Sequence, residues 1–553
     1  MKSVHINKDR GANFKIESMK VAGLIMLFAF ILFINLGGWD LWNPDEPRYA
    51  QVAREMMQTG QYVLPHINAE IYPDKPPLFF WLIALVSKPF GDVTAFSARF
   101  PSALAALFII LLTYFLGRKL YSPLTGFIAA LVLFTSSEFF MITTSARIDI
   151  PLTLCTTLAL FLFFCGYTRS NGRKKYYIAS YLCMGLAVLM KGPVGFFVPF
   201  ISIMLFLTAR KELYRLKQMQ LGKGLLIVAG IAALWLVPAC IMGGEEYTRE
   251  ILGKQIFGRV VSSYSHKKPF YYYLLNFPVG FLPWSLFIPS ACIYFWRKKR
   301  ENLNISFPFS WLAGTFIFFT LISGKRSLYL LPLYPAAAIL MAKFFHDHIT
   351  MEASGIKIIQ SKLFKIPCCV FFGLLVLSSI IIWFVIAGEF QIFKPLLYLK
   401  ANMYPVLVLL CTASLSGAVL IAIKQKVGFL FFLIVTFILT LSLLTVLEIF
   451  PSFNTLKSAK PFCRRIKNTV HPDDILIASF NPEMFNYFLN RAPIPEVKIS
   501  VTLEKTLRSS GKVYCLIREK HYKKSTEELK KMVTILDRDT IGSKTYYLTV
   551  NHF

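Results

Sequence analysis

Long apolar runs constrain this chain more than any other feature of its sequence. Runs near twenty residues recur between residues 21 and 450 and are separated by short polar loops. A helix of about twenty residues crosses the ~30 Å hydrocarbon core of a bilayer. Charged residues make up only 16% of the chain, whereas soluble domains carry about 25%. The sequence therefore predicts a polytopic α-helical membrane protein.

The basic residues outnumber the acidic ones, 60 to 30, and most of this excess lies in short loops. Clusters at residues 169–175, 210–223 and 297–300 separate apolar runs. Loops on the cytoplasmic side of membrane proteins carry such an excess of Lys and Arg. The net charge therefore indicates topology and contact with anionic membrane lipids, and we expect no nucleic-acid partner.

Thirteen membrane spans fit this charge pattern, with the amino terminus in the cytoplasm and the carboxy-terminal segment on the outer side. They are expected at about 20–37, 96–116, 123–142, 148–167, 176–190, 192–209, 222–242, 275–296, 307–323, 327–345, 366–387, 404–424 and 427–449.

The apolar segment at residues 77–90 has only fourteen residues and lies between two Lys-Pro pairs. Because this is too short for a span, we expect an interfacial or re-entrant helix. If it crossed, every later basic loop would face outward. Keeping it outside places the polar loops that carry the candidate chemistry on one face, at residues 38–95, 143–147, 243–274 and 324–326.

Two domains are expected, a transmembrane domain at residues 1–450 and an outer α/β domain at residues 451–553. The first outer loop, 38–95, contains an amphipathic helix at 46–59, because Pro44 and two acids precede apolar residues at helical spacing and Gly60 ends the pattern. In the carboxy-terminal domain, apolar β-rich runs near residues 475, 513 and 546 predict strands.

The ten cysteines form no CxxC pair, and eight of them lie in or beside apolar runs, where they are typical small hydrophobes. Cys463 and Cys515 lie in the polar carboxy-terminal segment. If that segment is periplasmic, a disulfide between them is one possibility.

The first candidate for chemistry is the pair Asp45 and Glu46, followed by Arg48. Acids in the first turn of a helix commonly cap it and interact with its dipole. Their place in a loop at the membrane boundary beside Arg48 favours catalytic roles for both carboxylates.

The second candidate is the string that begins at Tyr72 and continues through Asp74 and Lys75 into two prolines. Prolines on both sides hold the acid and the lysine with little backbone freedom. The string could be only a stiff entry to the apolar helix. A functional interpretation has Lys75 bind a lipid phosphate while Asp74 binds a metal or orients the lysine.

Further charged residues break apolar runs at the same membrane level. Asp149 follows Arg147 at the end of a span, where an unpaired carboxylate is costly. Lys191 interrupts an apolar hairpin, and either residue alone could be an interfacial anchor. Lys325 and Arg326, with Tyr329 one turn on, form a basic break between two spans, and cations on the outer face favour an anionic ligand. His266 lies in a polar loop, where a lone histidine is commonly just solvated.

These motifs together resemble one family. Trp-Asn-Pro-Asp45-Glu46-Pro-Arg48-Tyr-Ala, Tyr72-Pro-Asp74-Lys75-Pro-Pro-Leu, Arg-Ile-Asp149-Ile-Pro and Lys191-Gly-Pro-Val-Gly occur in that order. They are similar to motifs of the bacterial protein-mannosyltransferase-like membrane glycosyltransferases of the GT-C fold, and most similar to lipid A aminoarabinose transferases. The resemblance extends over essentially the whole chain.

The resemblance implies roles for single residues. Asp45 would be the principal catalytic carboxylate, with Asp149 on the acidic side of the site. Asp74 and His266 match positions that bind a divalent metal, zinc in the family, although family members often carry Glu where this chain has Asp74. The residues expected to line the cavity for the carrier phosphate are Arg48, Tyr72, Lys75, Lys191 and Tyr329.

The expected function is transfer of a sugar, 4-amino-4-deoxy-L-arabinose, from undecaprenyl phosphate to lipid A at the periplasmic face of the inner membrane. Transfer of a mannose-type sugar to protein or polysaccharide hydroxyls is an alternative. A lipid-linked sugar flippase is an alternative of another class, although we find no paired repeats of the kind common in transporters. A non-catalytic assembly partner would not need Asp45, Asp74, Lys75 and Asp149 on one face.

Overall fold

A computed structural model describes the chain at residues 19, 21–253, 268–297, 303–354, 362–387, 400–423, 426–497, 501–508 and 511–552. The chain divides into two compact units. The helical unit contains residues 1–36, 74–78 and 101–449, and the mixed unit contains residues 37–73, 79–100 and 450–553. The predicted domains 1–450 and 451–553 stay a prediction, since compactness alone does not define a domain.

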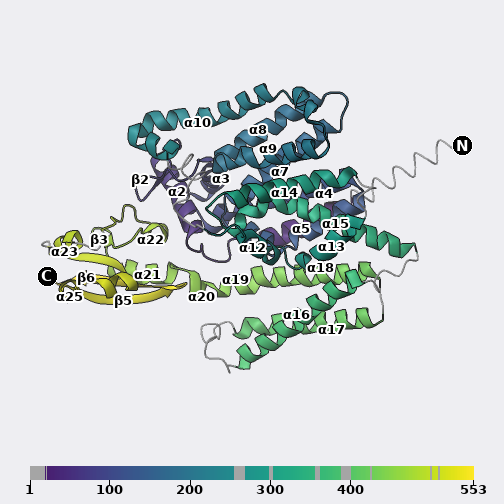
Figure 1. Ribbon diagram of the computed structural model, residues 1–553. Helices are drawn as coiled ribbons and strands as arrows, with labels where there is room; N and C mark the ends of the chain where they lie inside the picture. Colours follow the sequence, from purple (N-terminus) through teal and green to yellow (C-terminus); the bar gives the residue numbers. More distant parts are fainter. Residues whose placement is uncertain are drawn as a thin grey trace. The chain divides into compact units, whose positions relative to one another are not determined.

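The helical unit is built from apolar helices (Figure 1). In chain order they are Val21–Phe33, α4 (Ala95–Leu120, from residue 101), α5 (Pro123–Phe134), α6 (Ser137–Thr143), α7 (Asp149–Tyr167), α8 (Arg173–Lys191), α9 (Val194–Ala209), α10 (Leu221–Arg249), α12 (Tyr272–Gly280), α13 (Ile288–Arg297), α14 (Ser306–Leu321), α15 (Tyr334–Ala353), α16 (Lys362–Ala387), α17 (Lys400–Ala422) and α18 (Val427–Leu444).

Seven helices in the described residues are long and apolar enough to cross a bilayer, or up to nine if each of two bent pairs forms one span. The first bent pair is α5 with α6, at 69°, and the second is α12 with the helical segment Trp284–Arg297, at 113°. The spans predicted over 123–142 and 275–296 fall on these two bent pairs and stay predictions. The total of thirteen spans stays a prediction.

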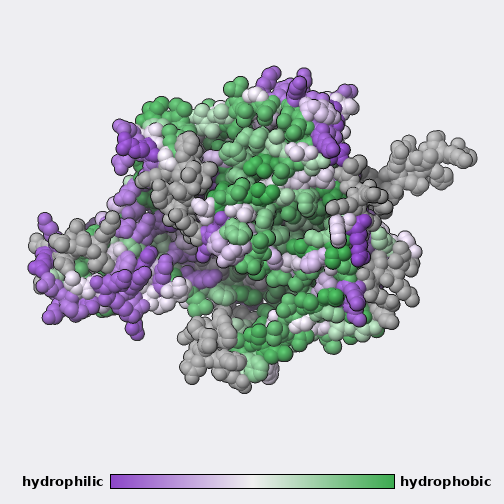
Figure 2. All heavy atoms as spheres, viewed as in Figure 1, coloured by the Kyte–Doolittle hydropathy of each residue, from purple (hydrophilic) through white to green (hydrophobic). Residues whose placement is uncertain are grey.

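The outward surface of the helical unit is largely hydrophobic, as Figure 2 shows in green over helices such as α10. Along α10, Leu226, Leu234 and Ile241 are 74%, 80% and 77% exposed. Large apolar side chains in water would be costly, whereas lipid tails solvate them without penalty. The chain is thus a multi-span membrane protein.

The mixed unit begins with the first loop. It contains α2 (Asp45–Thr59), a short hairpin of β1 (His66–Ile67) and β2 (Glu70–Ile71), α3 (Leu78–Ser87), the 3₁₀ turn Lys88–Phe90 and the start of α4. Gly60 ends α2 in the left-handed conformation, with φ of 70°, as expected for a glycine at this position. The helix α3 has ten residues, too few to cross a bilayer.

The rest of the mixed unit is a four-stranded sheet with short helices. The strand order is β3-β4-β6-β5, where β3 (Ile475–Ala478) is parallel to β4 (Val513–Arg518), and β6 (Lys544–Asn551) is antiparallel to β4 and to β5 (Val533–Ile541). The helices are α19 (Phe450–Ser452), α20 (Asn454–Lys457), α21 (Lys460–Thr469), α22 (Glu483–Leu489), α23 (Val501–Leu507), α24 (Glu519–Lys524) and α25 (Glu527–Lys531).

Both faces of this sheet are covered, because neighbouring residues of β4 point to opposite sides. Tyr514 and Leu516 belong to one buried cluster, and Cys515 and Ile517 belong to another. Cys463 lies in the first cluster and Cys515 in the second, and both are free thiols. The disulfide considered from the sequence is therefore absent, since the sheet separates the two cysteines.

Candidate functional site

The carboxylates Asp45 and Glu46 occupy the first turn of α2, directly after Pro44. Their position at this end of the helix is electrostatically favourable, because the exposed backbone N–H groups carry partial positive charge. The two side chains nevertheless have different surroundings, which favour a structural role for Glu46 and leave Asp45 as the candidate for chemistry.

Glu46 is held in a buried, two-pronged ion pair. Arg99 Nε donates to Glu46 Oε1 at 2.8 Å, and Arg99 Nη2 donates to Oε2 at 3.0 Å. The same guanidinium donates to the carbonyls of Trp39 and Asp40 and lies 4.3 Å from the centroid of the Trp39 ring. A bidentate carboxylate with both oxygens engaged favours a structural role for Glu46. Its catalytic role stays a prediction.

Asp45 is also buried, and a cation of the same helix lies near it. Arg48 Nη1 lies 3.9 Å from Asp45 Oδ1, one helical turn away. The separation fits an ion pair without a direct hydrogen bond. Asp45 is thus a carboxylate at a helix start, beside a partly exposed cation.

Arg48 makes its short contact elsewhere. Its Nε donates to Glu483 Oε2 at 2.5 Å, and its side chain is 27% exposed. Burial disfavours the charged guanidinium, but the Glu483 carboxylate and the phenol of Tyr72 outweigh this effect, so the pKa of Arg48 is raised. Arg48 is a permanent cation.

Tyr72 is fixed beside this helix start. Its backbone N–H donates to the carbonyl of Pro65 at 2.7 Å, and its ring packs edge-on against Phe80 with centroids 6.2 Å apart. Phe80 also packs against Tyr49 of α2. The structure therefore brings together the predicted residues Asp45, Arg48 and Tyr72.

The helix that carries these residues is not a surface helix. Eleven of the fifteen residues of α2 are buried, including Gln51, Arg54 and Glu55. Arg54 pairs with Asp92, and Glu55 accepts hydrogen bonds from the backbone of Asn68 and Ala69. The loop and α22 thus cover the polar side of α2.

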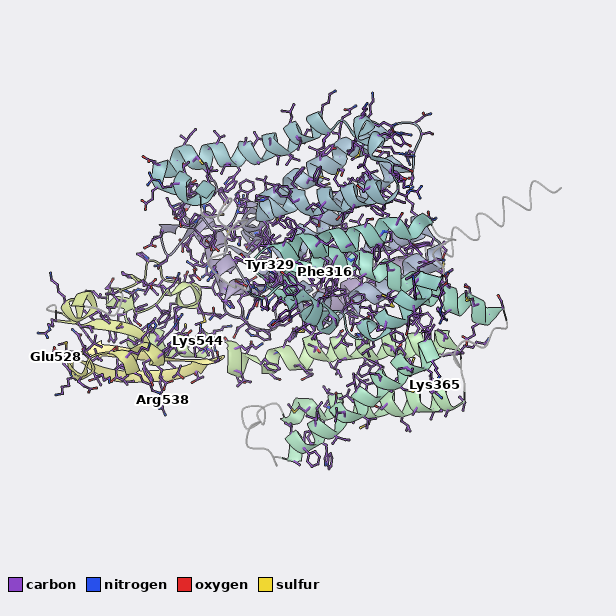
Figure 3. The ribbon with its side chains drawn as sticks, viewed as in Figure 1. Phe316, Tyr329, Lys365, Glu528, Arg538 and Lys544 are labelled. Carbon is purple, nitrogen blue, oxygen red and sulfur yellow. The ribbon has the colours of Figure 1, made fainter. Side chains whose placement is uncertain are left out.

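A second charged group lies in the helical unit. Asp149 starts α7 and forms an ion pair with Lys191, the last residue of α8. Lys191 Nζ also lies 3.9 Å from the ring centroid of Tyr329, which belongs to the 3₁₀ helix η6 (Ser327–Leu333). Tyr329 is labelled in Figure 3 among the helices of this unit. Three predicted residues from three elements thus meet here.

The helical unit holds further cations, and one of them, Arg147, interacts electrostatically with Asp149. Burial and the nearby Arg326 lower the pKa of Arg147 to about 10, although Asp149 acts in the opposite sense. Lys325 is buried, donates to the carbonyl of Ile322, and has a pKa lowered by burial. Concentrated positive charge of this kind favours an anion.

Another carboxylate of the helical unit, Glu138, was not predicted from the sequence. Glu138 in α6 accepts a hydrogen bond from the hydroxyl of Tyr334 at 2.7 Å and interacts electrostatically with Asp149. The available signal was an acid inside a predicted span, where a carboxylate is expensive and usually functional. Arg99, within another apolar run, gave the same signal.

The predicted metal pair is only partly described. Asp74 is partly buried in a turn of the helical unit next to Lys75, and His266 lies outside the described residues. Within the described ranges there is no group of three His, Cys, Asp or Glu residues that could hold a metal ion. One carboxylate does not define a metal site, so the zinc site stays a prediction.

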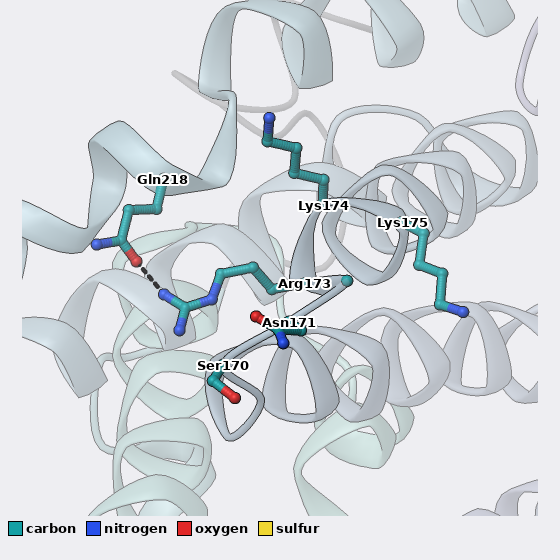
Figure 4. Close-up of a pocket in the computed structure, with 7 residues that line it drawn as sticks. Ser170, Asn171, Arg173, Lys174, Lys175 and Gln218 are labelled. Carbon is teal, nitrogen blue, oxygen red and sulfur yellow. Dashed lines mark hydrogen bonds between the residues drawn. The ribbon is translucent and has the colours of Figure 1, made fainter.

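A separate cavity of about 700 Å³ lies at the turn between α7 and α8 and beside η2 (Leu213–Met219) (Figure 4). Arg173 donates to the side chain of Gln218 there. The lining residues include none of the candidate site residues; they are Ser170, Asn171, Gly172, Arg173, Lys174, Lys175 and Gln218. The cavity coincides with the basic cluster at 169–175 that was predicted to be cytoplasmic.

Comparison with known proteins agrees with the motifs. Residues 74–236 match the family model described as dolichyl-phosphate-mannose-protein mannosyltransferase. A protein of Aquifex aeolicus, named only as uncharacterized, is 32% identical over 345 residues, which cover 62% of this chain and 67% of that protein. A protein of Edwardsiella ictaluri named undecaprenyl phosphate-alpha-4-amino-4-deoxy-L-arabinose arabinosyl transferase is 31% identical over 332 residues. That match covers 59% of this chain and only 60% of the transferase.

The fold has a counterpart among solved structures. The crystal structure of ArnT from Cupriavidus metallidurans bound to undecaprenyl phosphate superimposes with a TM-score of 0.78 over 96% of this chain and 98% of that one, at 18% identity. The fold and the charged helix ends define a membrane glycosyltransferase of the GT-C class. The chain belongs to the dolichyl-phosphate-mannose-protein mannosyltransferase family, in which it is close to the aminoarabinose transferases.

Proposed function

We propose that this chain transfers 4-amino-4-deoxy-L-arabinose from undecaprenyl phosphate to lipid A, with inversion at the anomeric carbon. The observation that carries the proposal is the Asp45–Arg48 pair at the start of α2, a carboxylate next to a permanent cation whose side chain is partly exposed. The names of similar proteins supply the sugar and the lipid carrier.

The reaction needs cations. When the anomeric C–O bond breaks, the leaving lipid phosphate gains negative charge, and positive groups in a low-dielectric site stabilise it. Arg48 is one such group, and Lys191, held by Asp149 and Tyr329, is another. The other residues proposed to contact the donor are Tyr72 in the mixed unit and, in the helical unit, Lys75, Lys325 and Arg326.

The role of Asp45 depends on the acceptor. A phosphate of lipid A is already an anion and needs no base, so Asp45 would bind the amino group of the donor sugar or stabilise the positive charge at its anomeric carbon. A sugar or protein hydroxyl has a high pKa, so Asp45 would then accept its proton as the new bond forms. Both roles require the carboxylate.

If a divalent metal is present, Asp74 is the described residue that would hold it, and the ion would neutralise phosphate charge. The steps above are assigned to side chains of the chain alone. The proposed location is the bacterial inner membrane, with Asp45 and residues 451–553 in the periplasm, because this orientation keeps the basic loops cytoplasmic.

The test is mass spectrometry of lipid A from cells with the gene deleted and then restored, with polymyxin sensitivity measured alongside. We expect deletion to remove a pentosamine-sized addition. Wild-type protein should restore it, and Asp45→Asn should not, although both proteins should reach the membrane in equal amounts.

Unchanged lipid A in deleted cells that make the aminoarabinose donor would reject this acceptor. Glycoproteins and surface polysaccharides would then be compared in the same strains, since mannose-type transfer to hydroxyls uses the same donor chemistry. Intact donor delivered across vesicles without any transfer would contradict the enzyme and favour a flippase.

A further inference from the structure

The first residue of α22, Glu483, is fixed on both sides of its carboxylate. Asn481 Nδ2 donates to Glu483 Oε1 at 3.1 Å, and Asn481 Oδ1 accepts from the backbone N–H of Glu483 at 3.2 Å. Glu483 Oε2 accepts from Arg48 Nε at 2.5 Å, and the Glu483 side chain is only 13% exposed. Both carboxylate oxygens therefore have defined partners.

The placement of α22 on α2 does not depend on this one contact. Arg54 Nη1 donates to the carbonyl of Tyr487 at 2.7 Å, and the guanidinium lies 4.3 Å from the centroid of the Tyr487 ring. Asn486 Nδ2 donates to Asn68 Oδ1 at 2.8 Å, and the Asn68 N–H donates to Glu55 of α2. These buried contacts fix the two helices within the mixed unit, so Glu483 stays beside Arg48.

The contact with Glu483 leaves one edge of Arg48 open. A guanidinium has an Nε side and a terminal edge formed by Nη1 and Nη2. Glu483 takes the Nε side, and in the described part of the chain neither terminal nitrogen of Arg48 donates a hydrogen bond; the carboxylate of Asp45 is 3.9 Å from Nη1. Arg99, by contrast, is fully buried, with Nε, Nη1 and Nη2 all engaged.

We propose that Glu483 is a positioning residue that anchors Arg48 through Nε and so presents the terminal edge of Arg48 to the phosphate of the lipid donor. The proposal rests on the donor class of the proposed function and extends it to the carboxy-terminal segment. A terminal guanidinium edge binds two phosphate oxygens side by side. Anchoring the long Arg48 side chain in advance reduces the conformational entropy that is lost when the phosphate binds.

The experiment measures binding of undecaprenyl phosphate to the purified full-length protein in detergent, which needs neither a sugar nor an acceptor. We expect Glu483→Ala to weaken binding about tenfold, because the long Arg48 side chain, no longer anchored in advance, must then be ordered as the phosphate binds. Glu483→Gln should weaken it only about threefold, since the amide oxygen still accepts from Nε.

The specific signature is non-additivity. In an Arg48→Ala background, Glu483→Ala should have no further effect, because its only route to the phosphate is gone. The matched control is Asp537→Ala, which removes an ion pair to Arg465 in the same segment and should bind like wild type. Thermal unfolding of each variant separates binding from folding, and Glu483→Gln carries the test if Glu483→Ala unfolds.

Two results would overturn the inference. The first is Glu483→Ala, or Glu483→Gln if Ala unfolds, binding as tightly as Asp537→Ala. The second is an equal loss from Glu483→Ala with and without Arg48, which would mean a general structural effect. Wild-type protein that does not bind undecaprenyl phosphate would overturn it as well. Failure of the proposed function would look different: the carrier would bind with this pattern, but lipid A would stay unmodified.

Discussion

Two helix starts, those of α2 and α7, use the same kind of residue in different ways. Asp45 and Glu46 share one turn of α2, where Glu46 is saturated by the buried Arg99 and Asp45 lies 3.9 Å from Arg48. Asp149 is the only acid in the first turn of α7, and it pairs with Lys191 from α8. Under the proposed function, the structural and reactive roles in α2 would be divided between neighbours, whereas in α7 one carboxylate would serve both.

From this difference we expect the two helix starts to tolerate substitution differently. The start of α2 should keep its fold when Asp45 is replaced, because Glu46 remains paired with Arg99. In α7, a change that breaks the pair of Asp149 with Lys191 should lower stability and activity together. The predictions below test this contrast, from the largest expected effect to the smallest.

Replacing Asp45 by Asn should reduce the rate of sugar transfer by about 10²- to 10⁴-fold, because the amide cannot act as a base or balance a positive centre. The measurement is transfer from the purified lipid donor to lipid A. The fold should be retained, since Glu46 still occupies the first turn. The exposed residue Asp473 provides the control, as Asp473→Asn; equal activities of the two variants would remove Asp45 from the chemistry.

Replacing Glu46 by Ala should mainly destabilise the protein, by about 3–5 kcal/mol, because it leaves the fully buried Arg99 without its carboxylate. Thermal unfolding in detergent measures the effect. The double variant Glu46→Ala with Arg99→Ala should be less destabilised than the sum of the single changes. The control Glu519→Ala breaks an exposed ion pair and should change little. A stable but inactive Glu46→Ala would mean that Glu46 is itself catalytic.

Replacing Lys191 by Met should reduce kcat/KM by about 10- to 100-fold, because it removes a cation and leaves Asp149 unpaired. Unlike the change at Asp45, this one should also lower thermal stability. If Asp149→Asn is added, stability should recover while activity does not. A loss of activity in Lys191→Met without any loss of stability would contradict the contrast between the two helix starts.

Replacing Tyr329 by Leu should have the smallest effect, a loss of about threefold in kcat/KM, because it removes only the ring beneath Lys191. Tyr329→Phe keeps that ring and is the matched control. Full activity of Phe with reduced activity of Leu would confirm the cation–π contact. Equal losses in both variants would instead point to the hydroxyl of Tyr329.

The sequence predicted those parts of the molecule that depend on local pattern. Hydropathy located the apolar helices, and the helix at 46–59 was found within one residue because proline, acids and glycine mark its ends. The bends after Phe134 and Gly280 were missed, since hydropathy continues through them. The strand β5 was missed because five of its nine residues are polar and at least partly exposed, so they interrupt any hydrophobic run.

The candidate site was predicted where the motif itself is contiguous. Asp45 and Arg48 are one turn apart, so their proximity follows from helical spacing. The ion pair between Asp149 and Lys191 joins two helices, and only the shared membrane level of these residues suggested it. Glu483 gave no signal, because its partner is 435 positions away in the chain and an acid at a helix start is ordinary in a polar domain.

The two thiols on opposite faces of the β3-β4-β6-β5 sheet are intrinsic probes of local unfolding. Cys463 and Cys515 are at most 1% exposed, and burial raises the pKa of both thiols, so neither reacts while its core is closed. A thiol reagent followed by peptide mapping would report the opening of each core separately. Equal labelling rates at the two positions would mean that both cores open as one cooperative block, and the experiment needs no engineered residue.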